Sequence, residues 1–153
     1  MSHRHVARIE WRFDGAGGGR YSRRHAWRFD GGAVVPGSSS PDVVPAPMSD
    51  PAAVDPEEAL VAAAASCHML LFLWVAQKAG FQVESYVDEA EGEMGRIAPG
   101  RMAMTRITLR PRIAFTGAAP DEATLQRLHH EAHEACYIAN SLKTEITIEA
   151  PPA

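Results

Sequence analysis

The chain contains two cysteines, Cys67 and Cys136, and their thiols are the side chains best suited to chemistry. A thiol acts as a nucleophile only as the thiolate, which forms readily beside positive charge or at a helix N-terminus. The immediate neighbours of Cys67 are Ser66, His68 and a run of apolar residues. Taken alone, a cysteine in such a segment is more often an inert core residue than a nucleophile. Spacing in the sequence does not show whether Cys67 and Cys136 meet as an attacking and a resolving thiol.

Histidines near Cys136 raise the alternative of a metal site. His129 and His133 lie four positions apart on one face of a predicted helix, and Cys136 follows three positions later. That face could ligate zinc if further ligands came from elsewhere. The His-Glu-x-x-His pattern of metalloproteases is absent, and the sequence offers no second cluster of ligands. We therefore predict no metal and no other cofactor, and we interpret the histidines as a solvated polar face.

Positive charge for a thiolate could come from arginines near the N-terminus. Four of them follow a glycine-rich segment, and these are Arg20, Arg23, Arg24 and Arg28. For most of them an exposed strand face is the simpler interpretation. The glycine-rich segment itself is interpreted as a plain turn, because no Gly-Lys-Ser/Thr follows it and no helix begins there.

Length and composition indicate one globular domain over residues 1–153. A net charge of −4 argues against nucleic acid as the main partner, since that binding depends on a basic surface. The N-terminus lacks the apolar segment of a signal peptide. Two cysteines without a secretion signal predict a reducing, cytoplasmic environment.

A long apolar helix is predicted to begin after Asp55 and to organise the rest of the chain. Asp55 can cap it, Pro56 suits its first position, and Glu57 and Glu58 place negative charge at its start. Asp55 and Glu58 have the spacing of a capping box, and Gly80 is a plausible stop. The helix is apolar on every side, so it is predicted to be buried all round, inside the domain or against a partner chain. It is long enough to cross a bilayer, but its polar start and Ser-Cys-His centre predict that it does not.

The other elements follow from hydrophobic periodicity and turn residues. We predict strands at 8–13, 20–29, 81–91, 102–115 and 144–149, and helices at 120–137 and, for one short turn, 138–143. A long Pro/Ser/Gly-rich loop, partly packed and with a short strand, is expected at 31–54, and a turn or loop at 92–100. The resulting order predicts an α+β fold of antiparallel sheet with buried helices.

Two segments together resemble the OsmC/Ohr family of thiol-dependent hydroperoxide reductases. They are Asp55-Pro56-Glu57-Glu58 leading to Ala65-Ser66-Cys67-His68, and Ala132-His133-Glu134-Ala135-Cys136 followed by Asn140-Ser141-Leu142-Lys143. The order of elements agrees along nearly the whole chain. The resemblance implies an OsmC-like fold, in which antiparallel sheets accompany two long buried helices in an intertwined homodimer.

The resemblance also implies a function. Cys67 is then the peroxidatic thiol, which attacks the O–O bond of an organic hydroperoxide and becomes a sulfenic acid, and Cys136 is the resolving thiol that forms a disulfide with it. Electrons would come from a dithiol reductant of the lipoyl type or from a small thiol. The apolar surroundings of Cys67 favour an organic peroxide over hydrogen peroxide.

The family further uses an arginine from the N-terminal region and a glutamate at the start of the long helix. Glu57 matches the glutamate, and Arg20 is the best match for the arginine, although Arg23 and Arg24 lie close enough to leave that choice open. The arginine would lower the pKa of Cys67 and stabilise the leaving alkoxide, while Glu57 holds it in place.

The spacing of these residues creates a difficulty. Glu57 and Cys67 are ten positions apart, which is about 15 Å along a straight helix. We therefore predict an irregularity between Pro56 and Ser66. Two features differ from many relatives or are unassigned: Tyr137 stands where many have proline, and His68 either tunes the thiol or simply packs. The alternative function is a non-catalytic protein of the same fold that binds a small apolar ligand.

Overall fold

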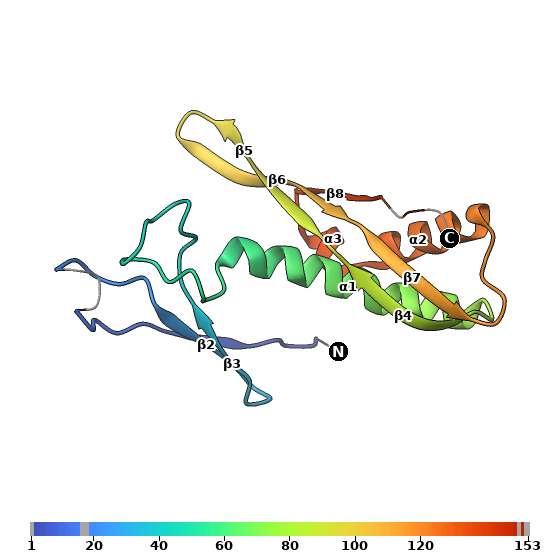
Figure 1. Cartoon of the computed structure of the whole chain (residues 1–153), viewed down its shortest axis with the longest axis horizontal. Helices are drawn as coiled ribbons and strands as arrows, with labels where there is room; N and C mark the ends of the chain where they lie inside the picture. Colours follow the sequence, from blue (N-terminus) through green and yellow to red (C-terminus); the bar gives the residue numbers. More distant parts are fainter. Residues whose placement is uncertain (1, 16–18, 150, 152–153) are drawn as a thin grey trace. The chain divides into compact units, whose positions relative to one another are not determined.

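The computed structural model describes residues 2–15, 19–149 and 151 of the chain (Figure 1). Its contacts divide into two compact units, Met1–Ala59 and Leu60–Ala153, which we describe one at a time. The single domain expected over residues 1–153 stays a prediction.

The first unit contains a three-stranded antiparallel sheet. β1 (Ala7–Glu10) pairs with β2 (His25–Phe29), which confirms the predicted N-terminal hairpin, and β2 pairs in turn with β3 (Val34–Gly37). Both strands of the hairpin are shorter than predicted. The apolar face of the first strand is also less buried than its alternation suggested, since Ile9 is 60% exposed. The predicted turn between the two strands includes residues 16–18, which lie outside the described residues.

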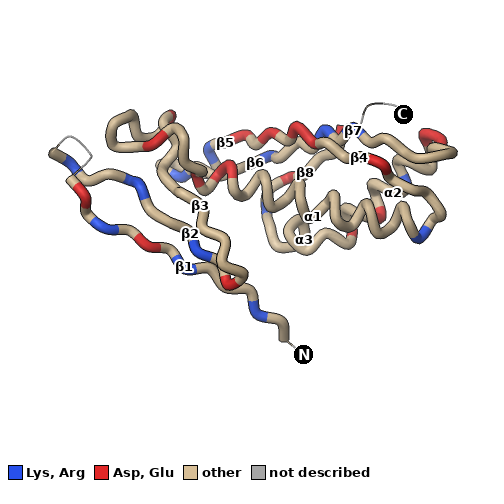
Figure 2. The backbone as a smooth tube through the Cα atoms, turned by 60° about the horizontal axis from the view of Figure 1, so that its bottom comes forward, with Lys and Arg blue, Asp and Glu red and all other residues tan. Residues whose placement is uncertain are grey.

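Basic residues are concentrated at the start of the chain. Seven of its 15 lysines and arginines precede position 30, and Figure 2 shows basic positions along β1 and β2. On this sheet Arg8 and Arg28 contact the carboxylate of Glu10 at 2.7 and 2.8 Å. The hydrogen bond from Arg28 is the main reason why the pKa of Glu10 is lowered. These ion pairs are exposed, so they contribute little to stability, and the expected exposed arginine face is confirmed for Arg28.

The Pro- and Ser-rich stretch at 31–54 is packed by hydrogen bonds, and it includes β3. The N–H of Ser38 donates to the carbonyl of Val54 at 3.0 Å, and the hydroxyl of Ser38 accepts from the N–H of Asp50 at 2.9 Å. The side chains of Ser38 and Ser49 are buried. The predicted combination of a partly packed loop and a short strand is confirmed.

α1 (Pro56–Lys78) begins and ends as predicted. The N–H of Glu58 donates to Oδ1 of Asp55 at 2.8 Å, and the N–H of Asp55 donates to Oε2 of Glu58 at 3.2 Å. This capping box satisfies two backbone donors at the helix start. At the other end Gly80 has a φ of +89°, and the N–H groups of Gly80 and Phe81 donate back to carbonyls of the last turn. Glycine adopts this left-handed conformation without steric cost, which ends the helix.

The second unit contains two sheets. β4 (Gln82–Asp88) pairs antiparallel with β7 (Pro111–Thr116). β5 (Glu91–Ala98) pairs antiparallel with β6 (Arg101–Leu109), and β6 pairs parallel with β8 (Glu145–Ile148). The last pairing corrects the expectation of a purely antiparallel sheet. A parallel pair needs a long crossover connection, and two helices between β7 and β8 provide it.

The loop predicted at 92–100 is wrong, because most of this stretch is strand β5. Gly92 and Gly95 are packing positions inside the strand, whereas Gly100, with φ +70°, lies in the turn that follows it. A Cβ built on Gly92 would lie 2.6 Å from Sδ of Met104, and one on Gly95 would lie 2.8 Å from Cγ2 of Thr105. Glycine inside a strand commonly marks such a close approach of a neighbour.

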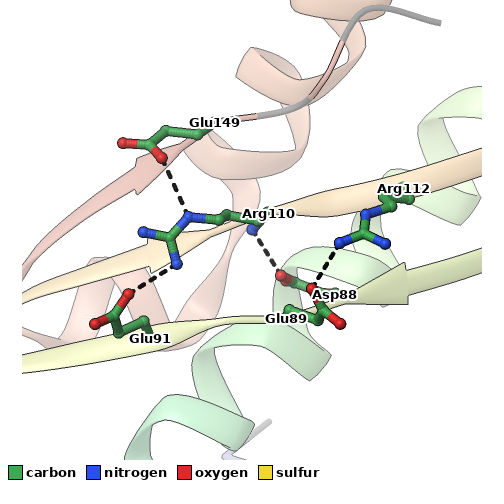
Figure 3. Close-up of polar contacts among 6 residues, drawn as sticks. All are labelled: Asp88, Glu89, Glu91, Arg110, Arg112 and Glu149. Carbon is green, nitrogen blue, oxygen red and sulfur yellow. Dashed lines mark hydrogen bonds and ion pairs between the residues drawn. The ribbon is translucent and has the colours of Figure 1, made fainter.

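The long strand predicted in the second half of the chain is divided into β6 and β7 at Arg110. The backbone N–H of Arg110 donates to Oδ1 of Asp88 at 2.7 Å, and its guanidinium contacts Glu91 at 2.9 Å and Glu149 at 3.2 Å (Figure 3). Pro111 cannot donate to a strand partner, so it stands at the first position of β7. These contacts hold the chain where it passes from one sheet to the other.

The second helical region is α2 (Glu122–Ala135) followed by α3 (Tyr137–Ser141), as predicted from periodicity. Asp121 caps α2 by accepting from the N–H of Thr124 at 2.8 Å. Cys136 lies between the helices, with φ −70° and ψ 111°, so it ends α2 and begins α3. The extended backbone at this one residue separates the two helices and fixes where its thiol lies.

The core of the second unit covers only part of α1. One cluster joins α1 to α2 and comprises Phe72, Val75, Ala76, Leu125, Leu128 and Ala132. A second cluster comprises Ala64, Ile107 and Leu109. On α1 itself Leu70 and Trp74 are 60% and 55% exposed. The helix is therefore not buried all round by its own chain, and burial of the remaining apolar face against a partner stays a prediction.

Among the described residues α1 is also the helix that is long and apolar enough to cross a bilayer by length and composition. A core helix of a soluble protein meets the same criterion. The middle of α1 carries Cys67, which neighbours Cys136, and His68, which hydrogen-bonds to His129 of α2. These polar contacts agree with the expectation of a helix that packs within a protein.

Candidate thiol site

The structure brings the two cysteines together. Cys67 lies in the middle of α1 and is partly exposed, whereas Cys136 follows α2 and is 2% exposed. Both thiols are free, and Cys67 lies close enough to Cys136 to raise the pKa of the Cys136 thiol. They are 69 positions apart in sequence, so packing of α1 against α2, rather than any local motif, creates the pair. Two neighbouring thiols can pass between a dithiol and a disulfide.

Cys136 has surroundings that keep it protonated. Burial is the largest influence and raises the pKa of its thiol, and the neighbouring Cys67 raises it further. The N–H of Ala139 donates to Sγ at 3.5 Å and, with the N–H of Ile138, lowers the pKa against that trend. A protonated thiol is a poor nucleophile toward a peroxide in solution. Cys136 therefore suits the role of a resolving thiol, whose target is the neighbouring Cys67.

A pair of buried histidines lies beside the thiols. Nε2 of His68 and Nδ1 of His129 are hydrogen-bonded at 3.0 Å, and both side chains are almost fully buried. The pKa of each imidazole is lowered to about 4, mainly by burial and, for His68, also by the neighbouring His129 and His133. Both rings are therefore neutral at pH 7.

The polar helix face expected at 129–133 exists only in part. His130 is exposed, but His129 points into the core, where its ring lies 4.5 Å from that of Phe72. The interpretation of a solvated face is therefore wrong for His129. His129 follows Leu125 by four positions and precedes Ala132 by three, so helical spacing already placed it on the apolar side.

The metal alternative finds no support in the described part of the chain. Residues 2–15, 19–149 and 151 hold no group of three or more His, Cys, Asp or Glu side chains arranged to bind a metal ion. One nitrogen of His129, which that alternative needed as a ligand, is already engaged with His68.

The remaining predicted site residues lie in the first unit. Glu57 is in the first turn of α1 and is half-buried, and Arg20 is exposed. Arg24 contacts Asp50 at 3.1 Å, and the guanidinium of Arg23 lies 3.8 Å from the centroid of the Tyr21 ring. Whether any of these arginines approaches Cys67 stays a prediction.

The irregularity predicted between Pro56 and Ser66 is wrong. α1 is helical without interruption from Pro56 to Lys78. The sequence argument required a break so that one arginine could serve both Glu57 and Cys67. The continuous helix weakens the role assigned to Glu57 more than the pairing of the thiols, which does not depend on it.

A shallow apolar pocket is present on the first unit. Its volume is about 450 Å³, and it is lined by Ile9, Trp11, Tyr21, Arg23, His25 and Ser39. Three of these side chains are large and apolar or aromatic, and Arg23 supplies a positive charge at the wall. A pocket of this composition suits a small apolar molecule with a polar end.

Comparisons with known proteins agree with the fold. The profile of the family described as OsmC-like protein matches residues 49–150. A solved OsmC-like protein of unknown function from Vibrio cholerae is 45% identical, with a TM-score of 0.92 over 98% of this chain and 100% of that one. An organic hydroperoxide resistance protein from Elizabethkingia anophelis has the same fold, with a TM-score of 0.70 over 99% of each chain, at 16% identity.

The curated relatives are more distant. Peroxiredoxin OsmC of Escherichia coli is 30% identical over 95 residues, which is 62% of this chain and 64% of that protein. The match thus spans somewhat less than two thirds of the relative's length. The family profile, in contrast, covers both cysteines, the whole of α1 and α2 and nearly all of the second unit. The chain belongs to the OsmC-like family of α+β proteins.

Proposed function

We propose that this protein is a thiol peroxidase that reduces organic hydroperoxides. The observation that carries the proposal is the contact between Cys67 and Cys136, which packing of α1 against α2 creates. The family supports it, since it includes a protein named peroxiredoxin OsmC and others named organic hydroperoxide resistance proteins.

The first step belongs to Cys67, the more exposed of the two thiols. Its sulfur attacks the terminal oxygen of the hydroperoxide, the O–O bond breaks and an S–O bond forms. The alkoxide leaves and becomes the alcohol by taking a proton, and Cys67 is left as a sulfenic acid. A nearby arginine would stabilise the alkoxide as it forms, and Arg20 is our candidate. Glu57 is the candidate that orients this arginine.

The second step belongs to Cys136. Its sulfur attacks the Cys67 sulfenic acid, the S–O bond breaks and the Cys67–Cys136 disulfide forms. The proton of the Cys136 thiol and the departing hydroxide leave together as water. A dithiol reductant, of the lipoyl type or a small thiol, then reduces the disulfide and becomes oxidised itself. We propose a reducing cytoplasm as the location, because the chain has only two cysteines and both have a role as thiols in this mechanism.

A second function is supported by the apolar pocket on the first unit. A protein of this fold without catalytic activity could use that pocket, lined by Trp11 and Tyr21 among others, to bind a small apolar ligand. The oxidation state of the thiols distinguishes the two functions, because a peroxidase oxidises its thiols whereas binding of a ligand leaves them reduced.

The deciding experiment treats the reduced protein with one equivalent of cumene hydroperoxide and follows free thiols and intact mass. We expect both thiols to disappear with a mass loss of about two hydrogens, as a disulfide requires. Hydrogen peroxide serves as the comparison and should react more slowly, because it gains nothing from apolar surroundings. If both thiols stay free with both oxidants, the peroxidase proposal is wrong and ligand binding becomes the better-supported function.

We further propose that the protein is a homodimer in which the exposed face of α1 meets a second copy. Leu70 and Trp74 are large, apolar and more than half exposed on this helix. Exposed apolar residues that share one element indicate an interaction surface. The resemblance to the OsmC/Ohr family implies an intertwined dimer with the two long helices at its centre, which would cover these side chains.

The Leu70→Glu and Trp74→Glu variants test this interface. Each places a charge where the dimer would exclude water, which costs several kcal/mol, so we expect light scattering to shift from twice the 16.6 kDa chain mass toward that mass itself. His130→Glu, at an exposed position of α2, is the control and should stay dimeric. A wild-type protein that elutes as a monomer at micromolar concentration would contradict the proposal.

A further inference from the structure

The histidine pair has a geometry that favours a directed hydrogen bond. The two rings are nearly parallel, with an interplanar angle of 8°, and their centroids are 5.4 Å apart, whereas Nε2 of His68 and Nδ1 of His129 are 3.0 Å apart. The centroids are thus separated by much more than the bonded atoms, so the rings meet edge to edge rather than face to face. The hydrogen bond then lies close to the plane of both rings, where it is strongest.

This hydrogen bond joins the two segments that carry the thiols. His68 directly follows Cys67 on α1, and His129 lies on α2, which ends at Cys136. The pair and the thiol contact are therefore two polar links between α1 and the segment formed by α2 and its cap. A change in the rotation of α1 about its axis would break the first link and misalign the second.

Apolar packing alone would fix this arrangement less well. The neighbouring cluster of Phe72, Leu128 and Ala132 buries apolar surface, but dispersion has little directional preference. A disulfide, in contrast, demands a Cβ–Cβ distance of roughly 3.5–4.5 Å and a defined torsion angle. A hydrogen bond between two rings with few rotamers constrains both the rotation and the register of the helices.

The histidine pair also lowers the stability of the fold, because it leaves polar nitrogens buried without partners. Nδ1 of His68 and Nε2 of His129 are buried without a hydrogen-bond partner, and the same holds for Nδ1 of His133. Because a neutral imidazole has one donor and one acceptor, the outer ends of the pair are one unpaired donor and one unpaired acceptor. Two phenylalanines in these positions would avoid that cost. Stability therefore gives no reason for histidine here, whereas geometric specificity does.

We propose that His68 and His129 act as a positioning pair, whose mutual hydrogen bond holds Cys67 and Cys136 in the alignment needed for closure of their disulfide. This inference rests on the proposed function, in which the Cys136 thiol displaces hydroxide from the Cys67 sulfenic acid. Neither histidine touches the peroxide or exchanges a proton with it. The pair acts on the second step and leaves the first step unchanged.

Four variants test the pair. His68→Phe and His129→Phe keep an aromatic ring but remove the hydrogen bond. His129→Asn and His68→Gln keep a polar atom close to the position of the bonded nitrogen, because the amide of Asn approximates Nδ1 and that of Gln approximates Nε2. His130→Phe, at the exposed neighbouring position on α2, is the matched control.

Two measurements are made on each variant. The first is the equilibrium of the Cys67–Cys136 disulfide with dithiothreitol buffers, which needs no peroxide. The second is the rate at which the disulfide closes after one equivalent of cumene hydroperoxide, compared with the rate at which the peroxide itself is consumed. Circular dichroism confirms that each variant is folded.

For the phenylalanine variants we expect disulfide formation to be about tenfold less favourable, a shift of about 30 mV toward easier reduction. We also expect closure to slow by about tenfold while peroxide consumption in the first turnover is unchanged, so that the sulfenic acid accumulates. The Asn and Gln variants should recover most of both quantities, and His130→Phe should match the wild type.

The outcomes separate this inference from the function on which it rests. Unchanged potentials and closure rates in both phenylalanine variants would overturn the positioning pair, whatever the protein does with peroxides. A wild type that forms the disulfide in dithiothreitol buffers but ignores peroxide would overturn the proposed function alone. A uniform loss in all four variants, including Asn and Gln, would assign the histidines a role in packing and would also overturn the inference.

Discussion

The Cys67→Ser variant should lose peroxidase turnover by on the order of 10³-fold or more, because a serine hydroxyl stays protonated at neutral pH and cannot form the sulfenic acid. The measurement is consumption of cumene hydroperoxide with a dithiol as reductant. The substitution removes little volume from a partly exposed position, so the fold should survive, and a wild-type circular dichroism spectrum checks this.

Cys136→Ser is the companion to this variant and should behave differently. Its Cys67 should still react once with peroxide, but the sulfenic acid has no partner thiol and should proceed toward the sulfinic acid as peroxide increases. Intact mass then shows a gain of oxygen instead of a loss of two hydrogens. If Cys136→Ser and Cys67→Ser were equally inert in the first turnover, the attacking and resolving roles assigned here would be wrong. If the Cys67→Ser variant kept turnover, the proposed mechanism would fail altogether.

The protein should lose stability as the pH falls from about 6.5 toward 4. The pKa of His68 and of His129 is about 4 in the fold and 6.5 for an exposed imidazole, so the unfolded chain binds more protons in this window. Below pH 6.5 protonation therefore favours the unfolded state. At pH 4.5 the loss should be roughly 2–3 kcal/mol for each histidine. Urea unfolding at pH 7.0 and pH 4.5, at one fixed protein concentration, measures it.

Carboxylates also titrate in this range, so a control must isolate the histidines. The double variant His68→Phe/His129→Phe lacks both imidazoles and should show a much smaller difference between pH 7.0 and pH 4.5. His130→Phe, which replaces an exposed histidine, should behave as the wild type. An equal dependence on pH in the wild type and in the double variant would show that the two histidines are not the cause.

Much of the fold could be predicted because its signals are local. The capping residues before α1 and Gly80 after it fixed that helix to within about a residue at each end. Alternation and turn residues located the N-terminal hairpin, and helical spacing located α2. The loop at 92–100 was misread because glycine has two uses, and the sequence does not distinguish a turn from a strand against which a side chain packs closely. The parallel pairing of β8 with β6 could not be predicted from the sequence either, because it depends on how the two preceding helices direct the chain back to the sheet.

For the candidate site, too, the sequence determines some features and the tertiary structure determines others. The sequence by itself determined which residues carry reactive groups, and two short motifs around Cys67 and Cys136 determined the family. Only the tertiary structure decided that these thiols are neighbours, that burial raises the pKa of Cys136, and that His68 and His129 hydrogen-bond to one another. The physical reason is that hydrogen bonds and pKa values depend on distance and desolvation between residues far apart in the chain. Periodicity specifies which face of each helix is apolar, but it does not specify the rotation at which two such faces meet.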